Sequence, residues 1–123
     1  MEDGKYIPLE ELDIYQLAME IGELVWNWVI SWDSFSKFHI GGQFTDAADS
    51  IAANVSEGYG RFHFKDKRNF YYNARGSLSE TKTWATKARQ RNLLSSENYD
   101  LLYSKLQELH RRLNQHIKSL PIN

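Results

Sequence analysis

The placement of proline limits the fold of this chain more than any other feature. Among its 123 residues only Pro8 and Pro121 are prolines, and each lies near one end. Proline breaks a helix because it removes a backbone donor and clashes with the preceding turn. The long stretch between the two prolines therefore carries no strong helix breaker, which predicts an all-α fold.

Weaker breaks divide this stretch into four expected helices. Glycines and turn-forming polar residues interrupt it at 41–42, 58–60 and 92–96. The predicted helices cover about residues 9–34, 44–59, 65–92 and 96–119. Because short connections place successive helices side by side, we expect an antiparallel up-and-down four-helix bundle, formed by a single domain over residues 1–123.

Apolar residues at helical spacing support this architecture. The first helix has a repeating apolar seam formed by Ile14, Leu17, Ile21, Leu24 and Trp28. The last helix has a comparable seam formed by Leu102, Leu106, Leu109, Leu113, Ile117 and Leu120. Hydrophobic residues make up 41% of the chain, which is enough for a buried core at this length.

The first helix also carries a second apolar stripe, on a different face. Tyr15, Met19, Trp26 and Ile30 lie roughly 120–160° around the axis from the seam, at about 100° per residue. A helix in a small bundle normally needs only one apolar stripe. We therefore expect these four residues to contact another copy of the chain; the alternative is a deeply buried first helix.

Small residues predict a close approach of the second and third helices. Gly76 lies in the middle of the third helix, where glycine costs about 1 kcal/mol relative to alanine. We expect close backbone contact at Gly76 to offset this cost. The small residues of the two helices are Ala47, Ala48, Ser50, Ala52 and Ala53, facing Ala74, Gly76, Ser77 and Ala85.

A basic residue recurs every seventh position through the middle of the chain. The repeat consists of Arg61, Arg68, Arg75, Lys82 and Arg89, and one helix would place it on nearly one face. Residues 1–60 hold two Lys/Arg against eleven Asp/Glu, whereas residues 61–123 hold thirteen against five. This basic ridge predicts nucleic acid, either RNA or DNA, as a partner. Further expected phosphate contacts are Lys65, Lys67, Lys87 and Arg91.

Two other interpretations of these residues remain open. Folding the second helix onto the third would place Glu57 opposite Arg68, Asp49 opposite Arg75 or Gly76, and Asp46 near Lys82, so acidic residues could neutralise part of the ridge. The aromatic residues beside the cations could stack on unpaired bases or belong to the core. We expect Phe70 and at least one of Tyr71 and Tyr72 to be buried, and Phe62 and Phe64 to be exposed in the turn.

Catalytic and metal-binding patterns are missing from the sequence. The chain has no cysteine, and its four histidines, His39, His63, His110 and His116, show no ligand spacing or Glu-x-x-His motif. We therefore expect no enzyme, metal or cofactor. The acidic start without an apolar stretch, and the lack of a long uncharged apolar segment, predict a cytoplasmic protein without a membrane span.

Two motifs resemble a known family. The segments 47–61 (AADSIAANVSEGYGR) and 74–80 (ARGSLSE) are similar to the four-helix-bundle proteins encoded in intervening sequences of bacterial 23S rRNA genes. These are related to the accessory variability proteins of diversity-generating retroelements. The resemblance implies a non-enzymatic homopentamer with a central channel. For the retroelement branch it also implies binding to nucleic acid and to a reverse transcriptase.

The family signature maps onto Gln43, Ser50, Asn54, Glu57, Gly58, Arg61, Gly76, Ser77 and Glu80. One departure is Thr45-Asp46, where family members usually have a basic residue. We expect the signature residues to be structural, either in helix packing or in a subunit contact. The main prediction is thus a non-catalytic, nucleic-acid-associated oligomer; the alternative is a purely structural module that binds another protein.

Overall fold

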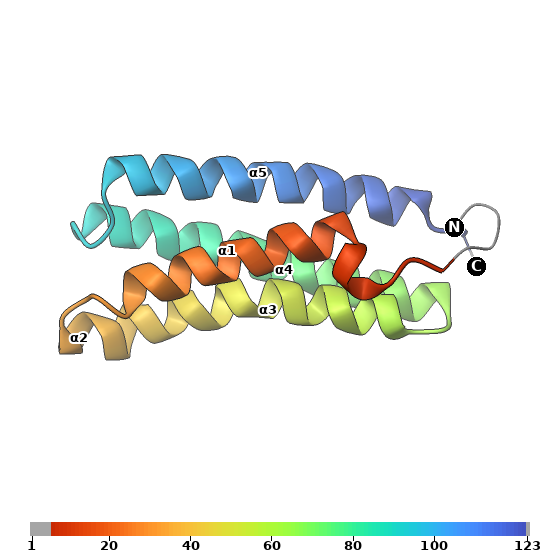
Figure 1. Cartoon of the computed structure of the whole chain (residues 1–123), viewed down its shortest axis with the longest axis horizontal. Coiled ribbons are helices and arrows are strands. Elements are labelled where there is room, and N and C mark those ends of the chain that lie inside the picture. The colour runs from red at the N-terminus through yellow and green to blue at the C-terminus, as the bar shows by residue number, and fades with distance from the viewer. Residues whose placement is uncertain (1–5, 123) are drawn as a thin grey trace.

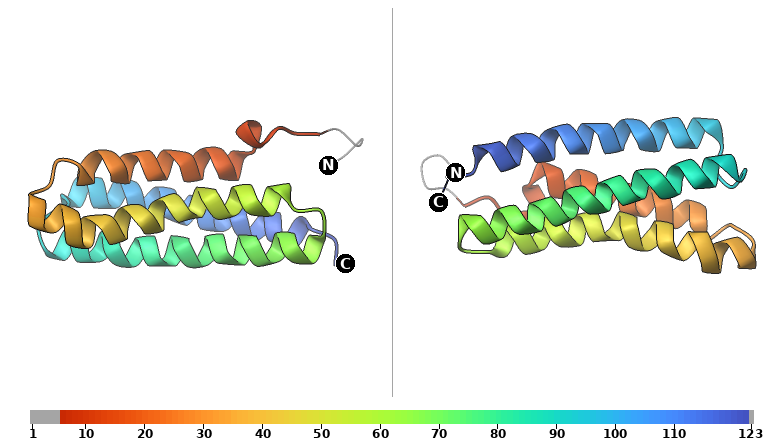
Figure 2. Two further views of the ribbon diagram at one scale, coloured as in Figure 1. Left: turned by 90° about the horizontal axis from the view of Figure 1, so that it is seen from below. Right: turned by 180° about the vertical axis from the view of Figure 1, so that it is seen from behind.

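Four long antiparallel helices form the molecule. The computed structural model describes residues 6–122 and contains α1 (Asp13–Val29), α3 (Gly42–Gly60), α4 (Phe64–Gln90) and α5 (Ser96–Ser119), with a short α2 (Ser34–Ser36) before α3 (Figure 1). α3 packs between α1 and α4, and α5 packs against α1 and α4 (Figure 2). This confirms the all-α four-helix bundle. The single-domain prediction spans residues 1–123, of which 1–5 and 123 lie outside the described residues.

The first turn lies earlier than the sequence predicted. α1 ends at Val29, and Asp33 begins the next helix by accepting a hydrogen bond from the Ser36 backbone at 3.1 Å. From α2 the chain continues through one π-helical turn, Lys37–Gly41, directly into α3. The glycine pair at 41–42 is therefore inside a helix. A Cβ on Gly41 would lie 2.8 Å from Val29 Cγ1, so this glycine allows close packing instead of ending a helix.

In the second half of the chain, the two helices lie close to their predicted bounds. α4 ends at Gln90, and Asn92 adopts a left-handed conformation with φ 61°, which amide side chains tolerate. Ser95 then accepts a hydrogen bond from the Asn98 backbone at 3.1 Å and starts α5, whose bounds match the prediction of 96–119.

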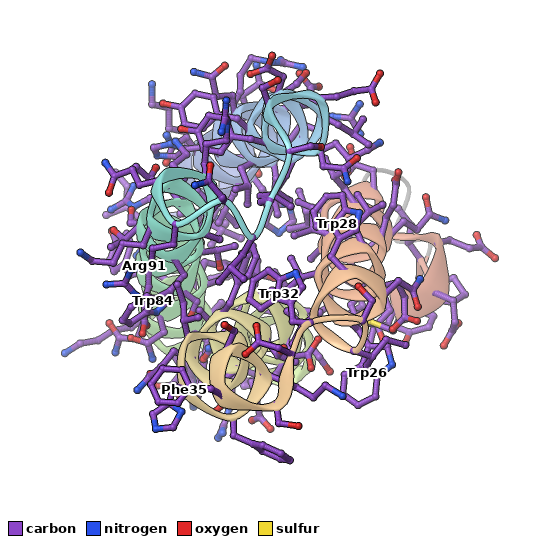
Figure 3. All side chains as sticks on the ribbon, turned by 90° about the vertical axis from the view of Figure 1, so that its left-hand side faces the viewer. Trp26, Trp28, Trp32, Phe35, Trp84 and Arg91 are labelled. Atoms are coloured by element: carbon purple, nitrogen blue, oxygen red, sulfur yellow. The ribbon has the colours of Figure 1, made fainter. Side chains whose placement is uncertain are left out.

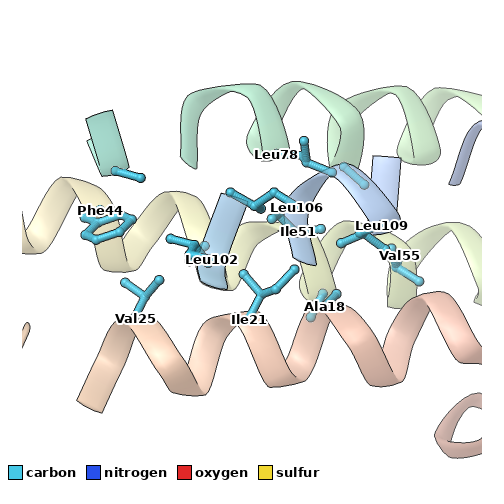
Figure 4. Packing of buried hydrophobic residues seen from close by; sticks show 14 of the residues in the cluster. Ala18, Ile21, Val25, Phe44, Ile51, Val55, Leu78, Leu102, Leu106 and Leu109 are labelled. Carbon is cyan, nitrogen blue, oxygen red and sulfur yellow. The ribbon is translucent and has the colours of Figure 1, made fainter. Parts of the chain in front are cut away.

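The core lies between the four long helices, and Figure 4 shows part of it from close by. The α5 seam is buried from Leu102 to Leu113, as predicted, with Ile117 only partly covered. On α1 the buried line is slightly rotated from the predicted seam. It consists of Ile14, Ala18, Ile21, Val25 and Val29, while Leu17 and Trp28 are partly exposed because they lie toward α5 at the edge of the core.

The close approach of α3 and α4 occurs at Gly58, not at Gly76. A Cβ on Gly58 would lie 2.8 Å from the ring of fully buried Tyr71, and 3.2 Å from Phe70 Cβ. Gly76 is exposed, and a Cβ there would meet nothing within 4 Å. The expectation for Gly76 was wrong because this residue lies on the outer side of α4, about 160° from Leu78 at about 100° per residue.

A partly buried histidine, His116, gives the fold a predicted dependence on pH. The His116 ring packs edge-on against Tyr71 with centroids 4.8 Å apart, and burial lowers the pKa of His116 below its usual 6.5 despite the opposing charge of Asp13. The unfolded state therefore takes up this proton first as the pH falls. We expect the unfolding free energy to decrease as the pH falls through about 6.5.

Urea unfolding at a series of pH values measures this effect. His116→Gln removes the titrating ring, so the unfolding free energy of this variant should decrease less as the pH falls below about 6.5. His63→Gln, a change on the exposed turn, serves as the matched control. An unchanged acid-side decline in His116→Gln contradicts the assignment.

Candidate nucleic-acid interface

Three members of the basic ridge lie along the junction of α4 and α5. Arg68 donates hydrogen bonds to the carbonyls of Pro121 and Ile122 at 2.6 and 2.7 Å. Arg75 donates to Asn114 Oδ1 at 2.8 Å, and its guanidinium lies 5.1 Å from the Tyr72 ring centre. All these partners are neutral, and within residues 6–122 no carboxylate makes an ion pair with either guanidinium.

Lys82 continues the same line toward the far end of α4. Its ammonium lies 5.3 Å from the ring centre of Tyr103 on α5. His110 also lies nearby: burial lowers its pKa, and the charges of Lys82 and Arg75 lower it further. His110 therefore lies close enough to both cations to interact with their charges.

One end of the ridge, Arg61, does not join this line. Arg61 precedes α4, which begins at Phe64, and it makes an ion pair with Glu57 at 3.0 Å and lies over Phe70. Arg89 is exposed in the last turn of α4. The seven-residue repeat therefore describes one face only between Arg68 and Arg89, a span of roughly 30 Å at about 1.5 Å per residue.

The acidic residues of α3 do not neutralise this face. Among residues 6–122, the only ion pair found between α3 and the ridge is that of Glu57 with Arg61. Asp49 lies instead in a groove between α1 and α3, with Oδ1 2.8 Å from where a Cβ on Gly22 would be. Burial and the charges of Glu23 and Asp46 raise the pKa of Asp49. The neutralisation hypothesis thus holds only at Arg61.

The four supplementary cations occupy different surroundings. Lys67 donates to the carbonyls of Gly58 and Tyr59, and burial lowers its pKa, so its charge stabilises the end of α3. Lys65 lies at the exposed turn, and Arg91 lies beside Phe35 at the opposite end (Figure 3). Only Lys87 borders the same junction as Lys82.

A groove between α4 and α5 adds aromatic rings that the sequence analysis missed. It has a volume of about 380 Å³, and its lining comprises Lys82, Thr83, Thr86, Lys87 and Gln90 from α4 with Tyr99 and Tyr103 from α5. No carboxylate lines it. The spacing of Tyr99 and Tyr103, four residues apart in a helix, was a signal that both rings share one face. We use "α4/α5 face" for Arg75, Lys82, Lys87, Tyr99, Tyr103 and His110.

The other predicted aromatics divide between core and surface. Tyr71 is fully buried, with a pKa raised by burial to about 12, and Tyr72 is 44% exposed, so the expectation for this pair is confirmed. Phe62 is 87% exposed in the turn, as expected. Phe64 and Phe70 are both partly exposed. Phe64 is therefore less exposed than predicted, and Phe70 is less buried than predicted.

The family-motif residues are mainly bonded within their own helices. Asn54 donates to the Ser50 carbonyl, the Ser77 carbonyl accepts from Thr81, and Glu80 accepts from Trp84. Gly58 is the motif residue with a clear packing role, described above. Gln43 and Gly76 are exposed. None of these three hydrogen bonds crosses between α3 and α4, and a role of the motif residues in helix packing or in a subunit contact stays a prediction.

The second apolar stripe of α1 is largely uncovered. Met19 is 45% exposed, and Trp26 and Ile30 are each 50% exposed, while Tyr15 packs partly on the core. Trp26 points outward from the bundle, away from Trp32 (Figure 3). The deeply buried first helix, the alternative to a subunit contact, is therefore wrong.

The described residues contain neither a metal cluster nor a membrane span. Within residues 6–122, no group of three or more His, Asp or Glu side chains is placed to hold a metal ion. None of the described helices combines the length and the hydropathy needed to span a membrane. The four histidines lie apart, each against a different neighbour: His39 on Phe35, His63 on Phe62, His116 on Tyr71, and His110 near Lys82.

Comparisons with known proteins agree with this architecture. A model of the family described as 23S rRNA-intervening sequence protein matches residues 10–115. Among solved structures, the chain is similar to a protein of unknown function from the S23 ribosomal protein family of Bacteroides thetaiotaomicron. That similarity has a TM-score of 0.80 at 19% identity and covers 87% of this chain and 96% of the other, which shows a shared fold. A search of curated proteins finds no match.

Proposed function

Because the chain belongs to the family of 23S rRNA-intervening sequence proteins, we propose that it is a non-catalytic, self-associating protein that binds nucleic acid through the α4/α5 face. One observation carries the proposal: Arg75 and Lys82 lie in line on this face with no carboxylate paired to either within the described residues. Phosphates bind to such a line mainly through charge, so recognition by backbone and shape is expected.

Direct titration tests the proposal. Fluorescence anisotropy of labelled structured RNA and labelled duplex DNA should show micromolar or tighter binding near physiological salt. Absence of binding to either probe, even at low salt, would contradict the proposal. It would favour the alternative function, a structural module whose partner is another protein.

The exposed stripe on α1 supports self-association. Met19, Trp26 and Ile30 form a row of large apolar side chains that water would otherwise cover, and such patches often mark protein contacts. We propose that this stripe lies at the subunit contact of a homo-oligomer, with five subunits as the expected number. A cytoplasmic location, supported by the lack of cysteine, and an association with a reverse transcriptase, supported by the family resemblance, are further parts of the proposal.

Charge placed on this stripe should dissociate the oligomer. In Met19→Glu/Trp26→Glu, two half-exposed apolar side chains become carboxylates, which we expect to shift the molar mass in solution to that of the 14.4 kDa monomer. Light scattering coupled to size exclusion measures the mass. Glu11→Gln/Gln16→Glu, a polar exchange at exposed positions before and on α1, is the matched control. A wild-type monomer, or an unchanged oligomer in the double variant, contradicts this assignment.

A further inference from the structure

The groove between α4 and α5 holds two tyrosine rings in a fixed arrangement. The rings of Tyr99 and Tyr103 lie 22° from parallel with centroids 5.7 Å apart. Thr86 Oγ1 lies 3.2 Å from the Tyr99 hydroxyl, and the Lys82 ammonium lies 5.3 Å from the Tyr103 ring centre. A neighbour on α4 therefore positions each ring, so a flat ligand that stacks there meets rings that are already oriented.

The rest of the lining suits a phosphorylated ligand. Lys82 and Lys87 supply two ammonium groups, and no carboxylate competes with a phosphate for them. Gln90 supplies an amide that can both donate to and accept from the edge of a base, while Thr83 adds a hydroxyl. Aromatic faces, cations and an amide together are the chemistry by which proteins hold unpaired bases.

The state of the bases decides which nucleic acid can use the two rings. The groove is open, with a volume of about 380 Å³, and the bases of a duplex are already paired and stacked on one another. A duplex can contact the α4/α5 face only through its phosphates, whereas an unpaired base can enter the groove.

We propose that this groove binds one unpaired nucleobase of a single-stranded nucleic acid, stacked on the Tyr99–Tyr103 pair with the flanking phosphates on Lys82 and Lys87. The inference rests on the proposed function, because it names the form of nucleic acid that the same face takes. It adds a base-binding position to a face otherwise defined by charge.

A base analogue whose emission reports stacking tests the proposal on the wild-type protein. The probe is a short single-stranded oligoadenylate with 2-aminopurine at its centre, and a duplex containing the same strand is the comparison. We expect the protein to quench the single-stranded probe on binding and to leave the emission of the duplex unchanged. Binding of the single strand without quenching would overturn the proposal.

Matched variants then assign the stacking to the groove. Tyr103→Leu should weaken binding of the single strand about tenfold while duplex affinity stays unchanged, and Tyr103→Phe, which keeps the ring, should bind like wild type. Phe62→Leu removes an exposed ring at the distant turn and should have no effect. Equal single-strand affinity for Tyr103→Leu and wild type, or full displacement of the probe by polyglutamate, would overturn the proposal.

Failure of the proposed function and failure of the base site give different results. If neither probe binds, the proposed nucleic-acid function fails and the base site fails with it. If the duplex binds and the single strand shows neither quenching nor a response to Tyr103→Leu, only the base site fails.

Discussion

Arg75→Glu/Lys82→Glu is expected to lower affinity for duplex nucleic acid about a hundredfold near physiological salt, because two phosphate-binding cations become repelling carboxylates. Both side chains lie on the α4/α5 face and make only neutral or cation–π contacts, so the bundle should stay folded. Anisotropy titration measures the affinity, and circular dichroism verifies the helices.

The control for this variant carries the same change in net charge on another face. Lys105 pairs with Glu20 of α1, and Lys37 lies in the turn before α3, so Lys37→Glu/Lys105→Glu changes the net charge equally at residues outside the α4/α5 face. We expect a much smaller loss of affinity for duplex nucleic acid in this variant. Equal losses in the two variants would mean that net charge, and not this face, determines binding.

Arg68 is left out of this test for a structural reason. Sequence reasoning alone suggests reversing Arg68 together with Arg75 and Lys82. The Arg68 guanidinium, however, holds the carbonyls of Pro121 and Ile122 beyond the end of α5. Changing Arg68 would alter folding and charge together, so a loss of binding would have two explanations.

Gly58→Ala is expected to destabilise the fold by about 2 kcal/mol, whereas Gly76→Ala should stabilise it by up to about 1 kcal/mol. The new methyl at Gly58 would lie 2.8 Å from the ring of Tyr71, which is fully buried and has no room to move. At Gly76 the methyl meets nothing within 4 Å, so only the gain in helix propensity remains.

Chemical denaturation of the two variants measures the difference, and each serves as the control for the other because both exchange glycine for alanine within a helix. If the unfolding free energy changes in the same direction in both variants, the assignment of the close contact to Gly58 is contradicted. A loss in Gly76→Ala that accompanies weaker self-association would instead place Gly76 at a subunit contact.

The helices could be predicted from sequence because their signals are local. Proline placement, the apolar seam of α5 and the turn signal at Asn92 and Ser95 each act within a few residues, and the bounds of α4 and α5 followed from them. The glycine pair at 41–42 misled the prediction because glycine serves two purposes. It breaks helices in isolation, yet Gly41 is needed here for contact with Val29, which no local pattern reveals.

The candidate site was only half predictable for a similar reason. A seven-residue repeat places Arg68, Arg75 and Lys82 on one side of α4, but it does not say which helix lies next to that side. Tyr99 and Tyr103 became part of the site only once α5 was packed against α4. The aromatic residues predicted for the site are neighbours of the cations in the sequence. The rings that line the groove are neighbours of the cations only in space, because they belong to another helix.

The salt dependence of duplex DNA binding by wild type and by Arg75→Gln/Lys82→Gln tests the central claim most directly. Each phosphate contact contributes about 0.9 to the slope of log affinity against log salt. If these two side chains bind phosphates, the slope of the double variant should be shallower by about 1.8. Equal slopes for the two proteins would contradict the claim that the α4/α5 face is the nucleic-acid interface.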